Sequence, residues 1–482
     1  MVLDILQNVA ALLVTLAVLI AVHEYGHFQV AKWCGVHVER FSIGFGKAFL
    51  RREGAPPKLS TEVPAEQSGT PVSIRQPANE PLRGTEFCVA MIPLGGYVKF
   101  LDERDSFVAE EHLTFAFNRK PVWQRALIAA AGPLANFLLA IVVYWLVFAM
   151  GVRDLSPVLE VKESTLAEQS GLRTGDEVTS LDGAPITDWT SFNLGLLDRL
   201  GESGHLMIGV ARSEVTTNQA RQQVARIPIQ TWLADEADPN PAQSLGVGLL
   251  LPTIPAVLGD ISEGGPAARA GLKSEDQIVE VDGAPIAGWA DFVSAIRAHP
   301  GEQLWISVVR EGERSDHWVT PESVEESGEQ IGKIGAALGV YDFPAERIRT
   351  REHSLVGAII PAAQKTWDMT RFTVESLVKM IQGLLSPRNL SGPITIAKIA
   401  GQTAASGLET YLGFIALISI SLAVLNLLPV PMLDGGHLLY YAVEALIGRP
   451  IPERIQYLGL QVGLVFLVGI MLLAFYNDLL RL

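Results

Sequence analysis

Three ionisable side chains lie within five residues of each other in an apolar stretch near the start of the sequence. They are His23, Glu24 and His27, in the order HEYGH. Residues at positions i and i+4 share one face of an α-helix, so both imidazoles can reach one metal ion while Glu24 approaches the water that the ion carries. Ionisable groups are costly to bury in a membrane-spanning helix, which favours function over a chance match. The pattern predicts a catalytic zinc site.

A catalytic zinc ion normally has three protein ligands and a water, so a third ligand must come from elsewhere in the chain. The candidate segment covers residues 426–435 and contains Pro429 and Pro431, which cannot continue a regular helix. We therefore expect broken backbone here, with Asp434 free to point inward. His437 is a rival ligand, because imidazole is as good a zinc donor as carboxylate.

Four apolar runs are long enough to place these motifs in a bilayer, whose core of about 30 Å needs about 20 apolar residues. They cover about 9–30, 127–150, 411–428 and 456–475. At 1.5 Å per helical residue, His23 lies about 24 Å beyond Gln7 and Asn426 about 22 Å beyond Tyr411. The two motifs are therefore expected to meet at one depth, near the cytoplasmic third of the bilayer. Buried helices of a large soluble protein are the alternative, which the length of the runs disfavours.

Composition and charge agree with membrane spans that alternate with acidic, water-exposed domains. Of the 482 residues 49% are hydrophobic, yet 52 Asp and Glu outnumber 37 Lys and Arg, for a net charge of −15. This balance excludes a disordered chain, a collagen-like chain and a basic nucleic-acid binder. Basic residues follow the first run, precede the second and lie between the third and fourth, as in cytoplasmic loops. Both termini and the acidic stretch 151–409 are then predicted to lie outside.

An internal repeat lies in that outer stretch, at a spacing of 100 residues. GLRTGDEVTSLDGAPITDW begins at Gly171 and GLKSEDQIVEVDGAPIAGW at Gly271. Each copy reads as a turn, a short alternating strand and an Asp-Gly hairpin turn, which predicts two β-rich domains. The pattern resembles bacterial PDZ domains, whose grooves bind extended peptides by strand addition. Glu275 stands where the first copy has Gly175, and glutamate disfavours the positive φ that glycine accepts.

The motifs together resemble the site-2 protease family of intramembrane zinc metalloproteases, in particular its RseP-type bacterial members with two PDZ domains. HEYGH fits the family's HExxH, and residues 426–435 fit its NxxPxPxLDG. Residues 41–46 (FSIGFG), 92–99 (IPLGGYVK) and 132–136 (GPLAN) fit supporting segments. The resemblance implies that His23, His27 and Asp434 ligate Zn²⁺, that Glu24 is the general base and that Asn426 contacts the substrate backbone.

The resemblance also implies the substrate class. It points to single-span membrane proteins already shortened on the outer side by another protease, such as an anti-sigma factor in envelope-stress signalling. Their transmembrane helix must be unwound locally, because it hides each peptide carbonyl in internal hydrogen bonds. We expect the segment 86–100 to offer a strand edge that holds the substrate extended, with Val89, Met91, Gly95 and Gly96 as the contact residues.

The sequence thus predicts a polytopic α-helical membrane protein of the bacterial inner membrane, with a membrane-associated β-sheet and two tandem PDZ domains outside. Its predicted parts are transmembrane helix 1 (1–33), a cytoplasmic β region (34–120) with a flexible polar insertion (53–84), transmembrane helix 2 (121–150), two PDZ domains (151–251 and 252–343), an amphipathic helical segment (344–409), transmembrane helix 3 (410–447) and transmembrane helix 4 (453–478). The amphipathic segment lies either on the outer membrane surface or against the PDZ pair.

Two other functions are compatible with parts of this pattern. One is a non-proteolytic membrane scaffold with PDZ docking modules and a structural zinc site, which a closed site with both Asp434 and His437 bound would favour. The other is a divalent-metal transporter, which would need ionisable groups along several spans, and the second and fourth apolar runs contain almost none.

Overall fold

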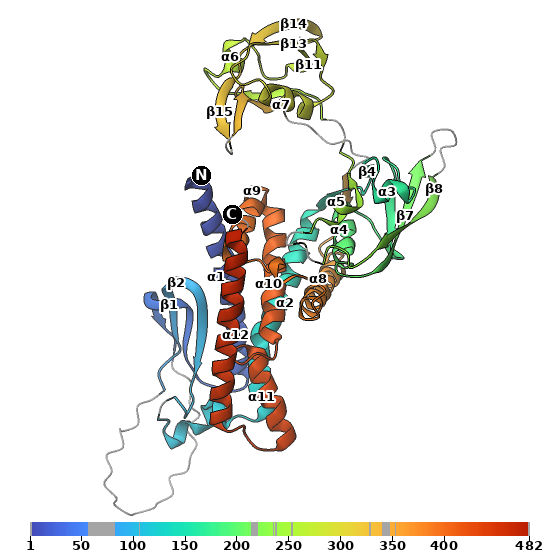
Figure 1. The fold of residues 1–482 in the computed structure, drawn as a ribbon. Coiled ribbons are helices and arrows are strands. Elements are labelled where there is room, and N and C mark those ends of the chain that lie inside the picture. Colours follow the sequence, from blue (N-terminus) through green and yellow to red (C-terminus); the bar gives the residue numbers. More distant parts are fainter. Residues whose placement is uncertain are drawn as a thin grey trace, which may run out of the picture.

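The computed structural model describes residues 2–55, 82–105, 107–213, 220–234, 236, 239–251, 254–326, 329–339, 348–351 and 353–480. Within these residues four helices are long and apolar enough to cross a membrane, as the sequence predicts. They are α1 (Val2–Trp33), α2 (Val122–Met150), α10 (Leu408–Leu427) and α12 (Glu453–Leu480). They stand side by side in Figure 1, with both chain ends at one end of the bundle. Most of the predicted insertion 53–84 lies outside the described residues.

Helices α1, α2 and α10 pack closely because small and polar residues face each other where they meet. A side chain at Gly26 of α1 would overlap the carbonyl oxygen of Ala131 on α2. The hydroxyl of Tyr411 donates to the carbonyl oxygen of Ala11 at 2.8 Å, and Ser419 Oγ donates to the carbonyl oxygen of Asn136 at 2.8 Å. These contacts fix how the three helices are rotated about their axes, and so which side chains face the centre.

The helix α10 ends before the two prolines, and a separate helix α11 (Asp434–Ile447) begins after them. The predicted transmembrane helix 3 is therefore two helices joined by a non-helical segment. Arg125 of α2 ties α11 to the bundle, because its Nη2 donates to Oε1 of Glu444 at 2.7 Å, and both side chains are 13% exposed. The non-helical segment between α10 and α11 places Asp434 in the first turn of α11.

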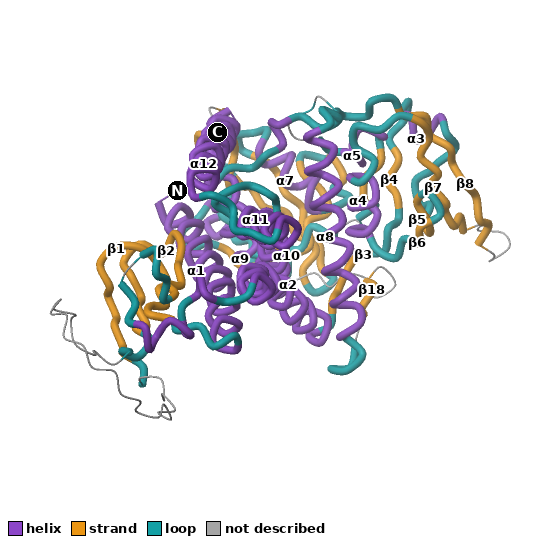
Figure 2. Tube along the Cα trace, turned by 90° about the horizontal axis from the view of Figure 1, so that it is seen from below, coloured by secondary structure: helices purple, strands orange, loops and turns teal. Residues whose placement is uncertain are grey.

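Two long strands, β1 (Val38–Glu53) and β2 (Glu86–Phe100), form a curled sheet beside α1. The sheet lies on the opposite side of the bundle from helix α8 (Ile359–Ile381), as Figures 1 and 2 show. Each strand folds back on itself, so that four strand segments lie in the order 96–100, 38–43, 86–90 and 48–53. Gly44 and Gly46, both at φ +91°, allow the reversal in β1. Two short 3-10 helices, Glu110–Phe115 and Phe117–Arg119, connect the sheet to α2.

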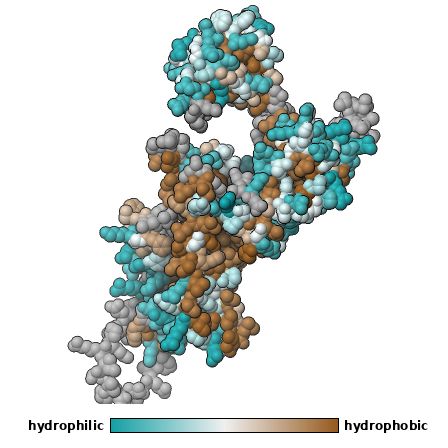
Figure 3. Space-filling model, viewed as in Figure 1, coloured by the Kyte–Doolittle hydropathy of each residue, from teal (hydrophilic) through white to brown (hydrophobic). Residues whose placement is uncertain are grey.

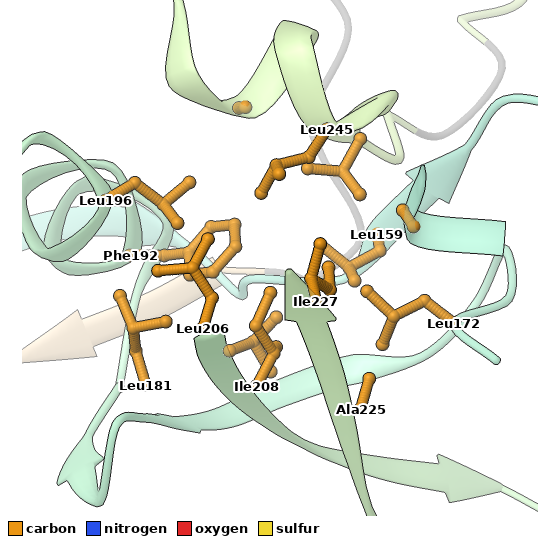
Figure 4. Close-up of a cluster of buried hydrophobic side chains, with 14 of the residues drawn as sticks. Leu159, Leu172, Leu181, Phe192, Leu196, Leu206, Ile208, Ala225, Ile227 and Leu245 are labelled. Carbon is orange, nitrogen blue, oxygen red and sulfur yellow. The ribbon is translucent and has the colours of Figure 1, made fainter. Parts of the chain in front are cut away.

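The predicted repeat is present as two β-rich modules. The first module (residues 156–251) has the four-stranded order β6-β5-β7-β8, and the second module (residues 254–339) has the equivalent order β12-β11-β13-β14. Each module also has a small strand pair, β4-β9 or β10-β17, and the second has an added hairpin β15-β16. Figure 4 shows the core of the first module, where Phe192, Leu206 and Ile227 are fully buried. Each module therefore has a hydrophobic core of its own.

The bounds of the first module's elements are β4 (Leu159–Val161), α3 (Leu166–Gln169), β5 (Glu177–Leu181), β6 (Ala184–Pro185), α4 (Trp189–Leu197), β7 (Gly204–Ser213), β8 (Ala220–Ile229), α5 (Pro241–Leu245) and β9 (Val247–Leu249). Those of the second are β10 (Leu258–Ile261), α6 (Pro266–Arg269), β11 (Gln277–Val281), β12 (Ala284–Pro285), α7 (Trp289–Arg297), β13 (Leu304–Arg310), β14 (Glu313–Val319), β15 (Glu322–Glu326), β16 (Glu329–Lys333) and β17 (Ala336–Leu338). A further pair, β3 (Val152–Leu155) and β18 (Ile348–Arg351), joins the two ends of this region.

The two modules share their turn conformation despite the change at one position. Gly175 has φ +95° and Glu275 has φ +72°, so the second module keeps the turn with a residue for which this region is unfavourable. The next residue of each copy is a buried aspartate held by two hydrogen bonds from one arginine, Asp176 by Arg212 and Asp276 by Arg310. In both copies the turn is followed by a buried aspartate that pairs with a partly exposed arginine.

The predicted amphipathic segment forms α8 (Ile359–Ile381), a 3-10 turn (Pro387–Asn389) and α9 (Pro393–Ala405). The sequence left open whether this segment lies on the outer membrane surface or against the PDZ pair; α8 packs against the first module and also against α2 and α10. Its Ala362 and Met369 are buried in the core shared with α2 and α10, and Lys379 donates to carbonyl oxygens of the first module. Hydrophobic residues gather over the helix bundle and hydrophilic ones over the modules, as Figure 3 shows.

Candidate active site

Three possible metal ligands meet where α1 and α11 face each other. Nε2 of His23 lies 3.2 Å from Oδ2 of Asp434, and Nε2 of His27 lies 3.5 Å from Oδ1. The two Nε2 atoms are 3.2 Å apart. Tetrahedral ligands at the usual zinc distance of about 2.0–2.1 Å lie about 3.3 Å from each other. The donor set and its spacing therefore fit one zinc ion.

The second ring nitrogen of each histidine faces a group of α2. Nδ1 of His27 lies 2.7 Å from the carbonyl oxygen of Ile128, so Nδ1 carries the hydrogen and Nε2 keeps its lone pair. Nδ1 of His23 lies 3.2 Å from the side-chain amide of Asn136, which is fully buried and whose Oδ1 has no partner. Turning this amide by 180° lets Oδ1 accept from Nδ1–H of His23, which leaves Nε2 of His23 free for a metal.

Gly132 makes room for the two imidazoles. A Cβ at this position would overlap Nε2 of His27 and lie 2.8 Å from Cε1 of His23. The segment GPLAN of α2 therefore supplies both the space for the ligands and a polar partner for one of them. From the sequence Asn136 belongs to a supporting segment and has no assigned role; the signal that could identify it is a polar amide within an otherwise apolar run.

The ligand set opens into a cavity of about 590 Å³ that also holds Glu24, Asn426 and the segment 96–100. Gly96 lies against Glu24, since a Cβ there would come within 2.8 Å of Cγ of Glu24. Arg104 lines the cavity as well, and its side-chain hydrogen bonds to Asp102 raise its pKa above the usual range. The cavity thus combines a carboxylate, an amide and a strand around the ligand set.

The strand segment beside this cavity is 96–100. In the described residues it pairs with β1 on one side only, so the other side keeps unpaired backbone groups. Val89 pairs with Ile43 on one side and Leu50 on the other, which leaves it no free edge. Gly95 faces the ring of Phe45, and Met91 is 69% exposed. Of the four predicted contact residues, only Gly96 lines the cavity.

His437, the rival ligand, lines the same cavity but stands outside the ligand group that the structure brings together. Its ring stacks at 27° to the ring of Tyr441, with centroids 6.4 Å apart. Within the described residues His23, His27 and Asp434 are the side chains grouped closely enough to hold one metal ion. A tetrahedral zinc ion held by these three would keep one position for water or substrate, as in catalytic rather than structural zinc sites.

Comparison with known proteins gives a consistent result. The family model described as "Peptidase family M50" matches residues 11–58 and 77–470. "Regulator of sigma-E protease RseP" of Escherichia coli (strain K12) is 40% identical over 481 residues, which cover 100% of both chains. The protein of that name from Salmonella typhimurium (strain 14028s / SGSC 2262) has the same identity and coverage. A "Putative zinc metalloprotease" of Vibrio cholerae is 38% identical over 99% of this chain and 100% of its own.

Proposed function

The chain belongs to peptidase family M50 and is a zinc metalloprotease of the bacterial inner membrane, and from that premise we propose that it hydrolyses a peptide bond within the transmembrane segment of single-span membrane proteins. The observation that carries the proposal is the position of Glu24. It lies inside a bundle of apolar helices, between three zinc ligands and a strand segment with one free edge. Because the surrounding helices are long and apolar enough to cross a membrane, a substrate helix in the bilayer can reach this cavity.

The residues around the cavity divide the work of the reaction. His23, His27 and Asp434 would hold the zinc ion, and when bound it would supply polarisation of the scissile carbonyl and a water whose pKa is about 7. Glu24 takes the proton of the attacking water and returns it to the leaving amine. Asn426 supplies an amide to the backbone of the unwound substrate. The free edge of residues 96–100 pairs with that backbone and replaces hydrogen bonds lost from its helix.

The two β-rich modules act in this proposal as PDZ domains that limit access to the site. They follow α2 on the side of the bundle where both chain ends lie, which is the outer side by the distribution of basic residues. Substrates with large outer domains would be excluded, and proteins already cut on that side, such as an anti-sigma factor, would enter. The name "Regulator of sigma-E protease" of the relatives supports this substrate class.

The variant Glu24→Gln tests the catalytic assignment. We expect it to retain zinc, because no ligand is changed, while a trimmed single-span substrate stays uncut in reconstituted vesicles. Tyr25→Phe is the matched control, since Tyr25 is the next residue but is 54% exposed, and its hydroxyl donates to Gln29. Cleavage at the normal rate by Glu24→Gln would show that another group activates the water.

Deletion of residues 151–343 tests the access model. The shortened protein should cleave substrates that still carry their outer domains, with zinc content and cleavage of trimmed substrates as controls for folding. If untrimmed substrates are still rejected while trimmed ones are cut, the modules do not act as a size filter.

A further inference from the structure

The face of the β1-β2 sheet that points away from α1 forms a hollow of about 510 Å³. The opposite face packs on α1, where Phe41, Ile43 and Val98 belong to the same hydrophobic cluster as Phe28. Because side chains alternate across a strand, the free face carries the residues between them. Its floor is made of the small residues Ser42, Cys88 and Ala90, which leave room for a ligand.

The hollow has an excess of positive charge. Arg40, Lys47 and Arg51 line it, and Glu86 is the carboxylate beside them. Glu86 is shared, since Nε of Arg40 donates to Oε2 at 2.6 Å and Nε of Arg51 pairs with Oε1. Among the described residues no carboxylate pairs with Lys47. Each guanidinium has five N–H donors, so both arginines keep donors for a further oxygen ligand.

Next to these cations the sheet exposes large apolar side chains. Phe49 is 82% exposed, Leu50 59% and Phe45 46%. In a sheet packed beside the membrane-spanning helix α1, such side chains are stable when they enter the acyl region of the bilayer. The cations of the hollow then lie close to the level of the lipid phosphates, on the cytoplasmic side where anionic lipids gather.

We propose that this hollow binds the phosphate of an anionic phospholipid headgroup, with Lys47, Arg40 and Arg51 as its ligands. A zwitterionic lipid fits less well, because its own ammonium group cancels the phosphate charge that the excess of cations would recognise. The bound lipid would also steady the catalytic sheet, since Tyr97 lines the hollow and its neighbour Gly96 lies against Glu24. This inference concerns a lipid site and stands whether or not the proposed substrate class is right.

The test measures, by native mass spectrometry, how tightly short-chain phosphatidylglycerol binds to the full-length purified protein. Each cation near the membrane surface contributes about fivefold to anionic lipid binding, so Lys47→Gln should weaken binding about fivefold and Lys47→Gln with Arg51→Gln about 25-fold. Arg52→Gln is the matched control, because Arg52 directly follows Arg51 in the sequence, is exposed and does not line the hollow. It should bind like the unchanged protein.

Two further probes separate the sources of phosphate. Phosphatidylcholine should bind at least several-fold more weakly than phosphatidylglycerol, and inorganic phosphate should not displace the lipid. Lys47→Gln breaks no recorded ion pair, so it keeps the test valid if the double variant unfolds. Unchanged binding by Lys47→Gln, an equal loss in Arg52→Gln, or displacement by inorganic phosphate would each overturn the lipid site.

Discussion

Asn136 offers a sharp test of how the metal site is held. Its side chain is fully buried and is the partner of Nδ1 of His23, so replacing it by leucine removes that partner without admitting water. Loss of such a partner of a metal-ligating histidine typically reduces metal affinity 10–100-fold. Because burial prevents water from taking over, we expect the upper half of that range for Asn136→Leu, which corresponds to about 2–2.7 kcal/mol.

The assay is competition for zinc between the purified protein and a chelator at fixed pH, with the absorption spectrum of the cobalt-substituted protein as a report on geometry. Asn136→Asp keeps an oxygen that can accept from Nδ1 and should bind zinc more tightly than Asn136→Leu. Ser419→Ala is the control, since Ser419 bonds only to the backbone oxygen of Asn136. Normal zinc affinity in Asn136→Leu, or an equal loss in Ser419→Ala, would refute this reasoning.

The remaining predictions concern the ligand pocket and the second module. Gly132→Ala places a methyl group against both imidazoles and should lower zinc affinity about tenfold or more, whereas Gly413→Ala, where a Cβ meets nothing within 4 Å, should not change it. In the present structure the left-handed conformation of Glu275 costs about 1–2 kcal/mol, and Glu275→Gly removes this cost. Glycine also raises the entropy of the unfolded chain, so the net gain in stability of the second module should be about 0.5–1 kcal/mol. Slower amide hydrogen exchange of β11 in the intact chain would measure it. Arg310→Ala leaves Asp276 buried and unpaired and should cost the same amides about 3 kcal/mol of protection, with Glu275→Gly as the opposite-sign reference. Burial alone would raise the pKa of Asp276, but hydrogen bonds from Arg310 and a backbone N–H lower this pKa. The ionised Asp276 therefore contributes stability above the unfolded pKa of about 3.9, and this contribution is lost as the pH falls below that value. Exchange protection that did not fall between about pH 5 and pH 2 would contradict this prediction.

Local periodicity explains how much of this protein can be predicted from its residues. The spacing of His23 and His27 is one helical turn, so their shared face follows from the helix alone. The four spans follow from run length, and the repeat follows from matching letters. The turn at Glu275 does not follow from the sequence, because glutamate disfavours a positive φ, yet the structure keeps it. The prediction of Asp434 as the third zinc ligand rests on the family resemblance, because by residue type alone His437 is an equally good zinc donor.

Long-range packing decided the rest. Val89 and Gly96 both belong to β2, and only the doubling back of both strands makes one of them interior and the other a neighbour of Glu24. Nothing in the local pattern of β2 distinguishes these outcomes, since they depend on pairing with residues of β1 that lie 39 to 53 positions away in the sequence. We therefore expect the segment 96–100, rather than Val89 and Met91, to contact the substrate.

Residue types and their spacing are enough to predict the chemistry of this protein: two imidazoles and a carboxylate on one helical turn, apolar runs of membrane length, and a duplicated β-rich module. The surroundings of these groups depend on how the helices pack. The close approach of α1 and α2 at Gly26 places Asn136 and the carbonyl oxygen of Ile128 on the two histidines, across more than 100 residues of chain. The physical reason is that helical periodicity fixes neighbours three or four residues apart, whereas contacts between helices depend on how small residues let their backbones meet.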